Sequence, residues 1–344
     1  MIRPDIHMAY MCGNAIPFEV FLSFGIKLTR IKGDGLVSYN SRCYFPTYMC
    51  SYAMSCLDII IREEQKYDGF IFENKCHAMV ALYEYLHEYM PNKKIFMINI
   101  PKINSLYSLE YYNIEELKLI NFIRNEFNVI ISDNILQEKR LEIKRITKYK
   151  KEIVDDIAKN SVPLSLRDIE VLDEFPGELH EIYDKELNSL EEKTKRKTEN
   201  ECYSPELLLS GIQITPLDII QVINDYGGKV ISYDNFETND LKYIQQDDLG
   251  SSKYTNNQSN HESIICNWNS GWIKKFEDKL ENYNVKGVIF STIKFCPIQS
   301  YGVILLSEIA KKKKIPFLVI NDSFSGSCSA QIHTRIQAFI ECLE

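Results

Sequence analysis

Three cysteines stand where a folded chain could present thiolates to one ligand. Cys76 and Cys296 each follow a short apolar segment that reads as a strand, and Cys50 opens a helical segment after a proline-containing loop. A thiolate is a soft ligand that suits zinc and iron–sulfur clusters. At the start of a helix it also gains from the helix dipole and from backbone N–H groups that lack a partner. A metal or cluster site is therefore one hypothesis.

The chain has ten cysteines, and burial as small hydrophobes is the commonest fate of a free cysteine. The absence of any CxxC pair argues against a zinc ribbon or a ferredoxin-type run. Three thiolates can instead bind three irons of a [4Fe–4S] cluster and leave the fourth iron open to another ligand. We interpret Cys12, Cys202, Cys266 and Cys342 as structural, and we assign no role to Cys43, Cys56 and Cys328.

The elements that carry Cys76 and Cys296 form a unit that is written twice, at Tyr67–Ile100 and at Val285–Asn321. Each copy is a short apolar strand, a cysteine just past its end, a helix, a lysine pair or run, and a second apolar strand. Alternating strands and helices predict parallel sheets, which bind ligands beyond the carboxyl ends of their strands. We therefore expect an α/β fold with two Rossmann- or flavodoxin-like domains whose parallel sheets face one another across a cleft.

A helical segment is expected to join the two domains. The predicted boundaries are 1–113 for the N-terminal domain with Cys50 and Cys76, 114–200 for the helical connector, and 201–344 for the C-terminal domain with Cys296. The expected strands are Met8–Met11, Gly69–Phe72, Ile95–Ile100, Leu207–Ile212, Lys229–Asp234, Gly287–Phe290 and Pro316–Ile320. The expected helices are Pro17–Phe24, Ser51–Gln65, Ala78–Tyr89, Ile114–Phe127, Asn134–Lys159, Thr215–Asp225, Trp272–Glu281, Tyr301–Lys312 and Gln331–Leu343, with more helix in Ser165–Leu190. Two polar stretches, Glu191–Asn200 and Glu237–His261, are expected to be a solvated connector and a loop.

Composition limits the class of protein. The 344 residues suit two domains, and 45% hydrophobic with 26% charged residues is typical of a globular chain. The net charge of -8 gives no electrostatic reason to expect nucleic acid or an anionic membrane as a partner. No apolar run approaches the roughly 18 residues of a membrane helix, and the N-terminus lacks the apolar stretch of a signal peptide. A cytoplasmic protein without disulfides is expected.

Five segments carry a resemblance to a known family. The C-terminal stretch is the most specific, with its cysteine after a strand and a Gln-x-x-Thr-Arg-x-x-Ala-Phe signature at 331–339. The segments are Ala15–Ile26, YMCSYAMSCLD around Cys50, FENKCHAMVALYEYL around Cys76, Leu207–Asp234 and Gly287–Glu341. The chain resembles the D-component subunits of the 2-hydroxyacyl-CoA dehydratase family, which also holds benzoyl-CoA reductase subunits and double-cubane cluster proteins.

The resemblance implies a cofactor, partners and a reaction. Cys50, Cys76 and Cys296 would ligate one [4Fe–4S] cluster per subunit, with an open fourth iron. The subunit would pair with a paralogue or with itself, and an ATP-hydrolysing [4Fe–4S] activator would supply one low-potential electron. Such dehydratases are lyases, and this chain would be one subunit of such a complex. They remove water from an (R)-2-hydroxyacyl-CoA through a ketyl radical and give a 2,3-enoyl-CoA.

Other candidate residues follow from the needs of this chemistry. Glu19 is the candidate catalytic acid or base, with a helix N-terminal residue favoured by the dipole as the alternative reading. Lys294 and Arg335 are candidates for the coenzyme A phosphates, and Arg335 could equally be a structural ion-pair partner. His77 stands where the family has an aspartate after the second cysteine, and that departure leaves the acyl group of the substrate open.

Two alternatives remain at this point. One is an ATP-driven reductase of the same superfamily, either benzoyl-CoA reductase-like or a protein with a double-cubane [8Fe–9S] cluster. The double cubane would need further thiolates from Cys43, Cys56 or Cys328. The other is a non-catalytic subunit that carries a cluster and scaffolds a partner.

Overall fold

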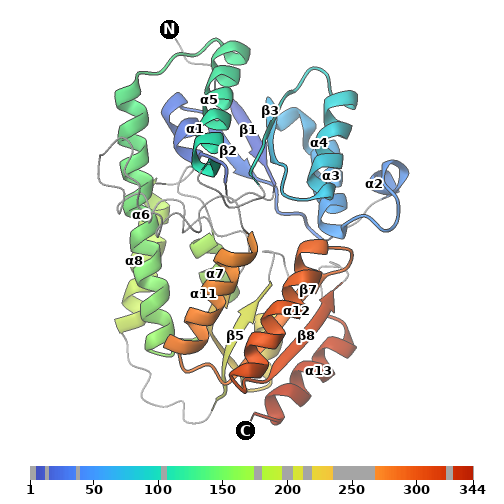
Figure 1. Cartoon of the computed structure of the whole chain (residues 1–344), viewed down its shortest axis with the longest axis vertical. Helices are drawn as coiled ribbons and strands as arrows, with labels where there is room; N and C mark the ends of the chain where they lie inside the picture. Colours follow the sequence, from blue (N-terminus) through green and yellow to red (C-terminus); the bar gives the residue numbers. More distant parts are fainter. Residues whose placement is uncertain are drawn as a thin grey trace.

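The protein is an α/β molecule with two halves, each built on a parallel sheet of four strands (Figure 1). The computed structural model describes residues 5–11, 15–35, 39–101, 107–173, 180–195, 204–211, 219–234, 268–322 and 328–343. No helix in these ranges is long and apolar enough to cross a membrane.

The N-terminal half has the strand order β2-β1-β3-β4, and every neighbouring pair is parallel. Its strands are β1 (His7–Tyr10), β2 (Lys27–Arg30), β3 (Gly69–Glu73) and β4 (Lys94–Ile98). Its helices are α1 (Phe18–Phe24), α2 (Tyr39–Tyr44), α3 (Ser51–Glu63), α4 (His77–Tyr89) and α5 (Ser108–Phe127), with a 3-10 turn at Glu64–Lys66.

The C-terminal half repeats this topology with the order β6-β5-β7-β8, again all parallel. Its strands are β5 (Glu206–Ser210), β6 (Lys229–Asp234), β7 (Gly287–Ile293) and β8 (Phe317–Asp322), and its helices are α9 (Ile219–Asp225), α11 (Trp268–Asn282), α12 (Pro297–Lys312) and α13 (Ala330–Glu341). The predicted duplication is thus confirmed, and it extends beyond the two quoted units to the first two strands of each half.

Three helices connect the halves: α6 (Asp133–Lys159), α7 (Leu166–Asp173) and α8 (His180–Lys195). With 27 residues, α6 is about 40 Å long and runs alongside both halves (Figure 1). Its residues Leu136 and Ile143 are buried in the core of the N-terminal half. Ile153 and Ile157 are buried in the core of the C-terminal half, so one continuous helix packs on both.

A second connection is a hydrophobic cluster that both halves share. It contains Leu57 of α3 and Leu82 of α4 together with Trp272 of α11 and Leu306 of α12, all at most 5% exposed. Burial of such side chains stabilises by about 1.5–3 kcal/mol each. The helices that carry the predicted cysteines therefore pack against a common core.

Several predicted elements have different bounds in the structure. β2 had no predicted counterpart, and α5, α11 and α12 begin four to six residues earlier than predicted. The stretch Glu191–Asn200, predicted to be a solvated connector, is helical over its first part because α8 continues to Lys195. There Lys193 donates to the carbonyl of Pro163 at 2.8 Å, which holds the last turns of α8 against the chain before α7. The loop predicted at Glu237–His261 and the helix start at Thr215 lie outside the described residues, and the domain boundaries stay a prediction.

The close approach of β5 and β7 predicts a specific cost for enlarging Gly211. At φ +75, a Cβ there would lie 2.5 Å from the carbonyl oxygen of Ser291 and 2.7 Å from the Phe290 ring. Gly227 has φ +85 but nothing within 4 Å of such a Cβ. Gly227→Ala should therefore cost about 1–2 kcal/mol for the left-handed backbone alone. Gly211→Ala should cost about 1–3 kcal/mol more because of overpacking. Denaturant unfolding of both variants measures the difference, and equal losses would contradict it.

Candidate functional site

The three predicted cysteines occupy equivalent places in the fold, because each is the N-cap residue of a helix. Cys50 caps α3, Cys76 caps α4 and Cys296 caps α12. Since α4 follows β3 and α12 follows β7, two of the thiols lie at the carboxyl ends of their sheets. Cys50 is 9% exposed and Cys296 is 7% exposed, whereas Cys76 is half-buried. In Figure 1, α3 and α4 of the upper half stand above α12 of the lower half.

The three thiols lie within range of one another's charge. Burial raises the pKa of Cys50 to about 11, and the charge of Cys76 adds to this shift. Burial likewise raises the pKa of Cys296 to about 12, with further increases from the charges of Cys50 and Cys76. The structure therefore brings together the thiols of the N-terminal half and the thiol of the C-terminal half.

Backbone N–H groups lower the pKa values of Cys50 and Cys296 and so offset part of the effect of burial. The N–H groups of Tyr52 and Ala53 face the sulfur of Cys50 and lower its pKa, and those of Ile298 and Gln299 do the same for Cys296. Neither cysteine side chain makes a full capping hydrogen bond. Each sulfur thus has N–H dipoles at hand that favour a thiolate, in surroundings that otherwise disfavour one.

These properties fit an iron–sulfur cluster better than a single metal ion. Buried thiols with raised pKa values are neutral without a metal, and a bound cation would draw them into the thiolate form. Among the described residues, no three His, Cys, Asp or Glu side chains converge closely enough to hold one ion. A [4Fe–4S] cluster takes each cysteine on a different iron, so its ligands do not have to meet at one point.

Of the remaining described cysteines, Cys56 lies within range of the charge of Cys50. Cys56 is fully buried in α3, and its thiol faces the carbonyl of Ile31 at 3.7 Å, with burial raising its pKa. Cys43 is exposed on α2, and Cys342 is exposed at the end of α13. Cys328 is half-buried just before α13. Cys12, Cys202 and Cys266 lie outside the described residues.

Glu19 is buried in the first turn of α1, at 2% exposure, within a polar group that sequence reasoning did not find. The O–H of Tyr112 in α5 donates to the carbonyl of Ala15 at 2.6 Å. The N–H of Ala15 donates to Glu73, the last residue of β3 and three residues before Cys76. The turn that leads into α1 and Glu19 is therefore held by the strand that leads to Cys76.

The charges of nearby glutamates act on Tyr112. Burial raises the pKa of Tyr112 well above its usual value, and the charges of Glu19, Glu116 and Glu73 raise it further. Arg140 of α6 pairs with Glu116 and supplies positive charge to the group. The signal available in the sequence was a glutamate at the end of the apolar strand FIF, next to the cysteine segment.

Asp234, at the carboxyl end of β6, is a second buried carboxylate that the sequence analysis did not single out. It accepts a hydrogen bond from Ser210 Oγ at 3.2 Å and another from Trp272 Nε1. Lys279 of α11 lies 3.8 Å away. Because these donors occupy it, Asp234 serves to fix the ends of β5 and α11.

The other predicted site residues are solvent-exposed. Lys294 lies in the turn before Cys296, Arg335 lies on α13, and His77 is the first residue of α4. Nothing in the described structure places Arg335 in contact with the cysteines. Its predicted role in binding phosphates therefore stays a prediction, as does that of Lys294.

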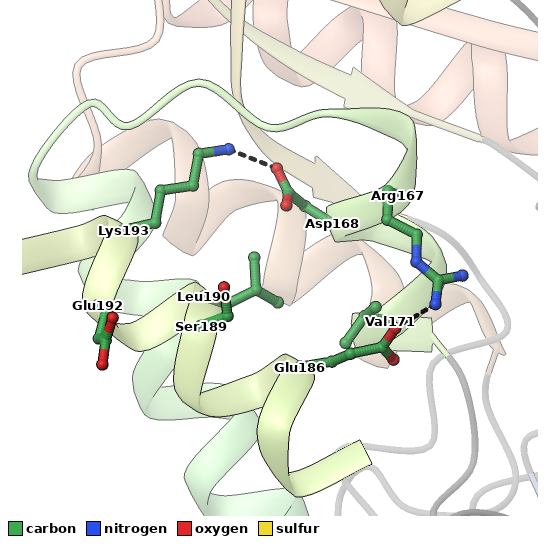
Figure 2. A pocket seen from close by; sticks show the side chains of 8 residues that line it. All are labelled: Arg167, Asp168, Val171, Glu186, Ser189, Leu190, Glu192 and Lys193. Atoms are coloured by element: carbon green, nitrogen blue, oxygen red, sulfur yellow. Dashed lines mark hydrogen bonds and ion pairs between the residues drawn. The ribbon is translucent and has the colours of Figure 1, made fainter. Parts of the chain in front are cut away.

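A hollow of about 300 Å³ lies between α7 and α8, away from the cysteines (Figure 2). Its basic side chains are paired, Lys193 with Asp168 at 2.6 Å and Arg167 with Glu186. It is lined by Arg167, Asp168, Val171, Glu186, Ser189, Leu190, Glu192 and Lys193. With its basic side chains paired and no thiol in its lining, the hollow does not form part of the cysteine site.

The tie between Tyr112 and Ala15 predicts a measurable contribution to stability. Tyr112→Phe would leave the buried Ala15 carbonyl without its donor and should cost about 1–3 kcal/mol. Tyr111→Phe, at a neighbouring position that is 42% exposed, should stay within about 0.5 kcal/mol of wild type. Urea unfolding compares the two, and equal effects would show that the bond contributes nothing.

The same pair predicts a pH dependence. Tyr112 ionises near its usual pKa when unfolded, but the folded state keeps it protonated well above that value. The folded state then binds more protons, so wild-type stability should fall as pH rises above about 10. Tyr112→Phe lacks this contribution, so the stability difference between the two proteins should shrink with rising pH.

Comparison with known proteins identifies the family of this chain. The family model described as "2-hydroxyglutaryl-CoA dehydratase, D-component" matches residues 14–343. The Escherichia coli K12 protein named "Putative dehydratase subunit YjiM" is 24% identical over 304 residues, which cover 80% of this chain and 74% of that protein. A solved structure of the SBP FpvC from P. aeruginosa with Ni2+ aligns with 98% of this chain and 94% of the FpvC chain. The identity is 9% and the TM-score is 0.25. Because the family match spans nearly the whole sequence, this chain belongs to the 2-hydroxyglutaryl-CoA dehydratase D-component family.

Proposed function

We propose that the chain is the cluster-bearing subunit of a 2-hydroxyacyl-CoA dehydratase, with one [4Fe–4S] cluster held by Cys50, Cys76 and Cys296. The observation that carries this proposal is the meeting of three helix N-caps from both halves, with their thiols in range of one another's charge. Membership of the D-component family supports it independently.

The chemistry that a bound cluster supplies is one low-potential electron for the thioester carbonyl of an (R)-2-hydroxyacyl-CoA, with one iron open to the substrate. The protein must manage the protons. The hydroxyl group leaves as water only if it gains a proton, and the β-carbon must lose one for the 2,3-enoyl-CoA to form. Water elimination therefore needs a positioned acid or base close to the cysteines.

Glu19 suits that task. It is buried beside Tyr112, and the turn before it is bonded to Glu73 on the strand that leads to Cys76. A carboxyl group in dry surroundings can hold or release a proton at a defined place. In this proposal Glu19 exchanges a proton with the substrate, and Glu73 and Tyr112 hold the backbone that carries it.

The proposal includes partners. As a D-component, the chain would work with a second subunit of related sequence, or with a copy of itself, and with an ATP-dependent activator that delivers the electron. Because loss of water is redox-neutral overall, the electron would have to return from the substrate once water has left.

The positions of the other cysteines favour one cluster per chain over a double cubane. Cys56 directs its thiol to the carbonyl of Ile31, and Cys43 is exposed on a different helix. Cys328 precedes α13, which packs in the other core cluster of the C-terminal half. A non-catalytic cluster-carrying subunit remains the second candidate, because the same three thiols would serve it.

Iron content tests the cluster. Protein purified and reconstituted without oxygen should hold about four irons per chain, whereas about eight would indicate a double cubane. Cys296→Ser should sharply lower bound iron because it removes one ligand, and Cys342→Ser, at an exposed helix end, should leave it unchanged. Wild-type protein without iron would rule out the cluster proposal.

Turnover tests the catalytic role. Supplied with its partner subunit, activator, ATP and a 2-hydroxyacyl-CoA, Glu19→Gln should lose about 10²–10⁴-fold in kcat because the carboxyl proton is gone. Its iron content should match wild type. The matched control is Glu206→Gln, at the amino end of β5, which should keep full activity. Normal turnover by Glu19→Gln would remove Glu19 from the reaction. No turnover of any 2-hydroxyacyl-CoA by iron-loaded wild type would favour the non-catalytic subunit.

A further inference from the structure

Gln299 makes two buried hydrogen bonds that tie the turn before Cys296 to the first strand of its sheet. Its side chain is 0% exposed, and it is the third residue of α12 after the cap Cys296. The amide Nε2 donates to the carbonyl of Gly211 at 2.7 Å, and Oε1 accepts from the N–H of Ile293 at 2.5 Å. Because one partner can only accept and the other can only donate, the amide has one satisfied orientation.

Ile293 anchors the backbone of Cys296. The N–H of Cys296 donates to the carbonyl of Ile293 at 3.1 Å, and the carbonyl of Cys296 accepts from Ser300 N at 3.1 Å and Ser300 Oγ at 2.9 Å. Phe295 lies between Ile293 and Cys296 in the chain and has a left-handed φ of 65. A bulky residue keeps this conformation only where its surroundings impose it. Its side chain is 57% exposed, so hydrogen bonds rather than packing hold this turn.

The other end of the tie is rigid as well. The N–H of Gly211 donates to the carbonyl of Asp234 at 2.9 Å, and Asp234 also accepts from Ser210. A side chain at position 211 would collide with β7, so the end of β5 has little freedom. Gln299 thus joins the Cys296 turn to a fixed point.

We propose that Gln299 is a positioning residue that holds the Cys296 sulfur in place for the cluster; the cluster part of this inference rests on the proposed function. The backbone N–H of the same residue faces that sulfur. Gln299 therefore acts on Cys296 in two ways. Its side-chain amide holds the turn before Cys296, and its backbone N–H faces the Cys296 sulfur. Groups of this kind set ligand orientation, metal affinity and reduction potential.

The test compares wild type with Gln299→Met, which keeps the length of the side chain but satisfies neither Gly211 nor Ile293. In the iron-free full-length protein, iodoacetamide should alkylate Cys296 roughly tenfold faster or more, with Cys50 unchanged, as read by peptide mass spectrometry. After anaerobic reconstitution, the bathophenanthroline concentration that removes half of the iron should fall roughly tenfold. The EPR spectrum of the reduced cluster should also change.

Ile336→Ala is the control for lost stability, because Ile336 is fully buried in the other core cluster of the same half. It should lower Tm while leaving Cys296 alkylation and the EPR spectrum as in wild type. If Gln299→Met does not fold, Gln299→Asn keeps the amide but is one methylene too short to reach both Gly211 and Ile293, and it should show the same effects more weakly.

Wild-type alkylation of Cys296 in the folded variant would overturn the inference, as would an acceleration equal to that of Ile336→Ala at the same stability. Wild-type protein that takes up no iron would refute the cluster but not the positioning, because the alkylation rates are measured without metal.

Discussion

Three thiols that belong to different halves of the molecule can act together only if the halves keep a fixed relation. Because each cysteine is the N-cap of a helix, the position of its sulfur is fixed relative to that helix but not relative to the other two cysteines. The shared cluster around Leu57, Leu82, Trp272 and Leu306 contains buried residues from all three capped helices. The long helix α6 adds a second link, since its two ends are buried in different cores. Burial of apolar surface, rather than any bond between the cysteines, therefore sets the geometry of the site.

The same burial has an electrostatic consequence. Thiols enclosed by apolar side chains resist ionisation, and the N–H groups at the helix starts offset only part of this. Cys50 and Cys296 therefore ionise only where a cation compensates the charge of their thiolates. This couples metal binding to the release of protons from these two cysteines.

Much of this arrangement could be predicted from the sequence, because its determinants are local. The duplicated strand–cysteine–helix pattern predicts both sheets and places Cys76 and Cys296, and α1 follows from Pro17 and Gly25 at its ends. The short strand β2 was missed because KLTR carries no alternating pattern and gains its order from pairing with β1. Glu73, Tyr112 and Asp234 were missed for a related reason. Their roles depend on partners 97 residues apart in the case of Tyr112 and Ala15, and no local pattern encodes such a pair.

The two halves hold the backbone that follows their first strand with different residues. In the N-terminal half the backbone at Ala15, just before α1, is held by Glu73, which comes from the strand before the cysteine. In the C-terminal half the backbone at Gly211, just after β5, is held by Gln299, which comes from the helix after the cysteine. The residue of α4 equivalent to Gln299 is Met79, which is buried in the apolar cluster and forms no such tie. The tie is a carboxylate three residues before Cys76 in one half and an amide three residues after Cys296 in the other. The two halves thus share the cysteine at a helix N-cap but not the residue that holds the neighbouring backbone.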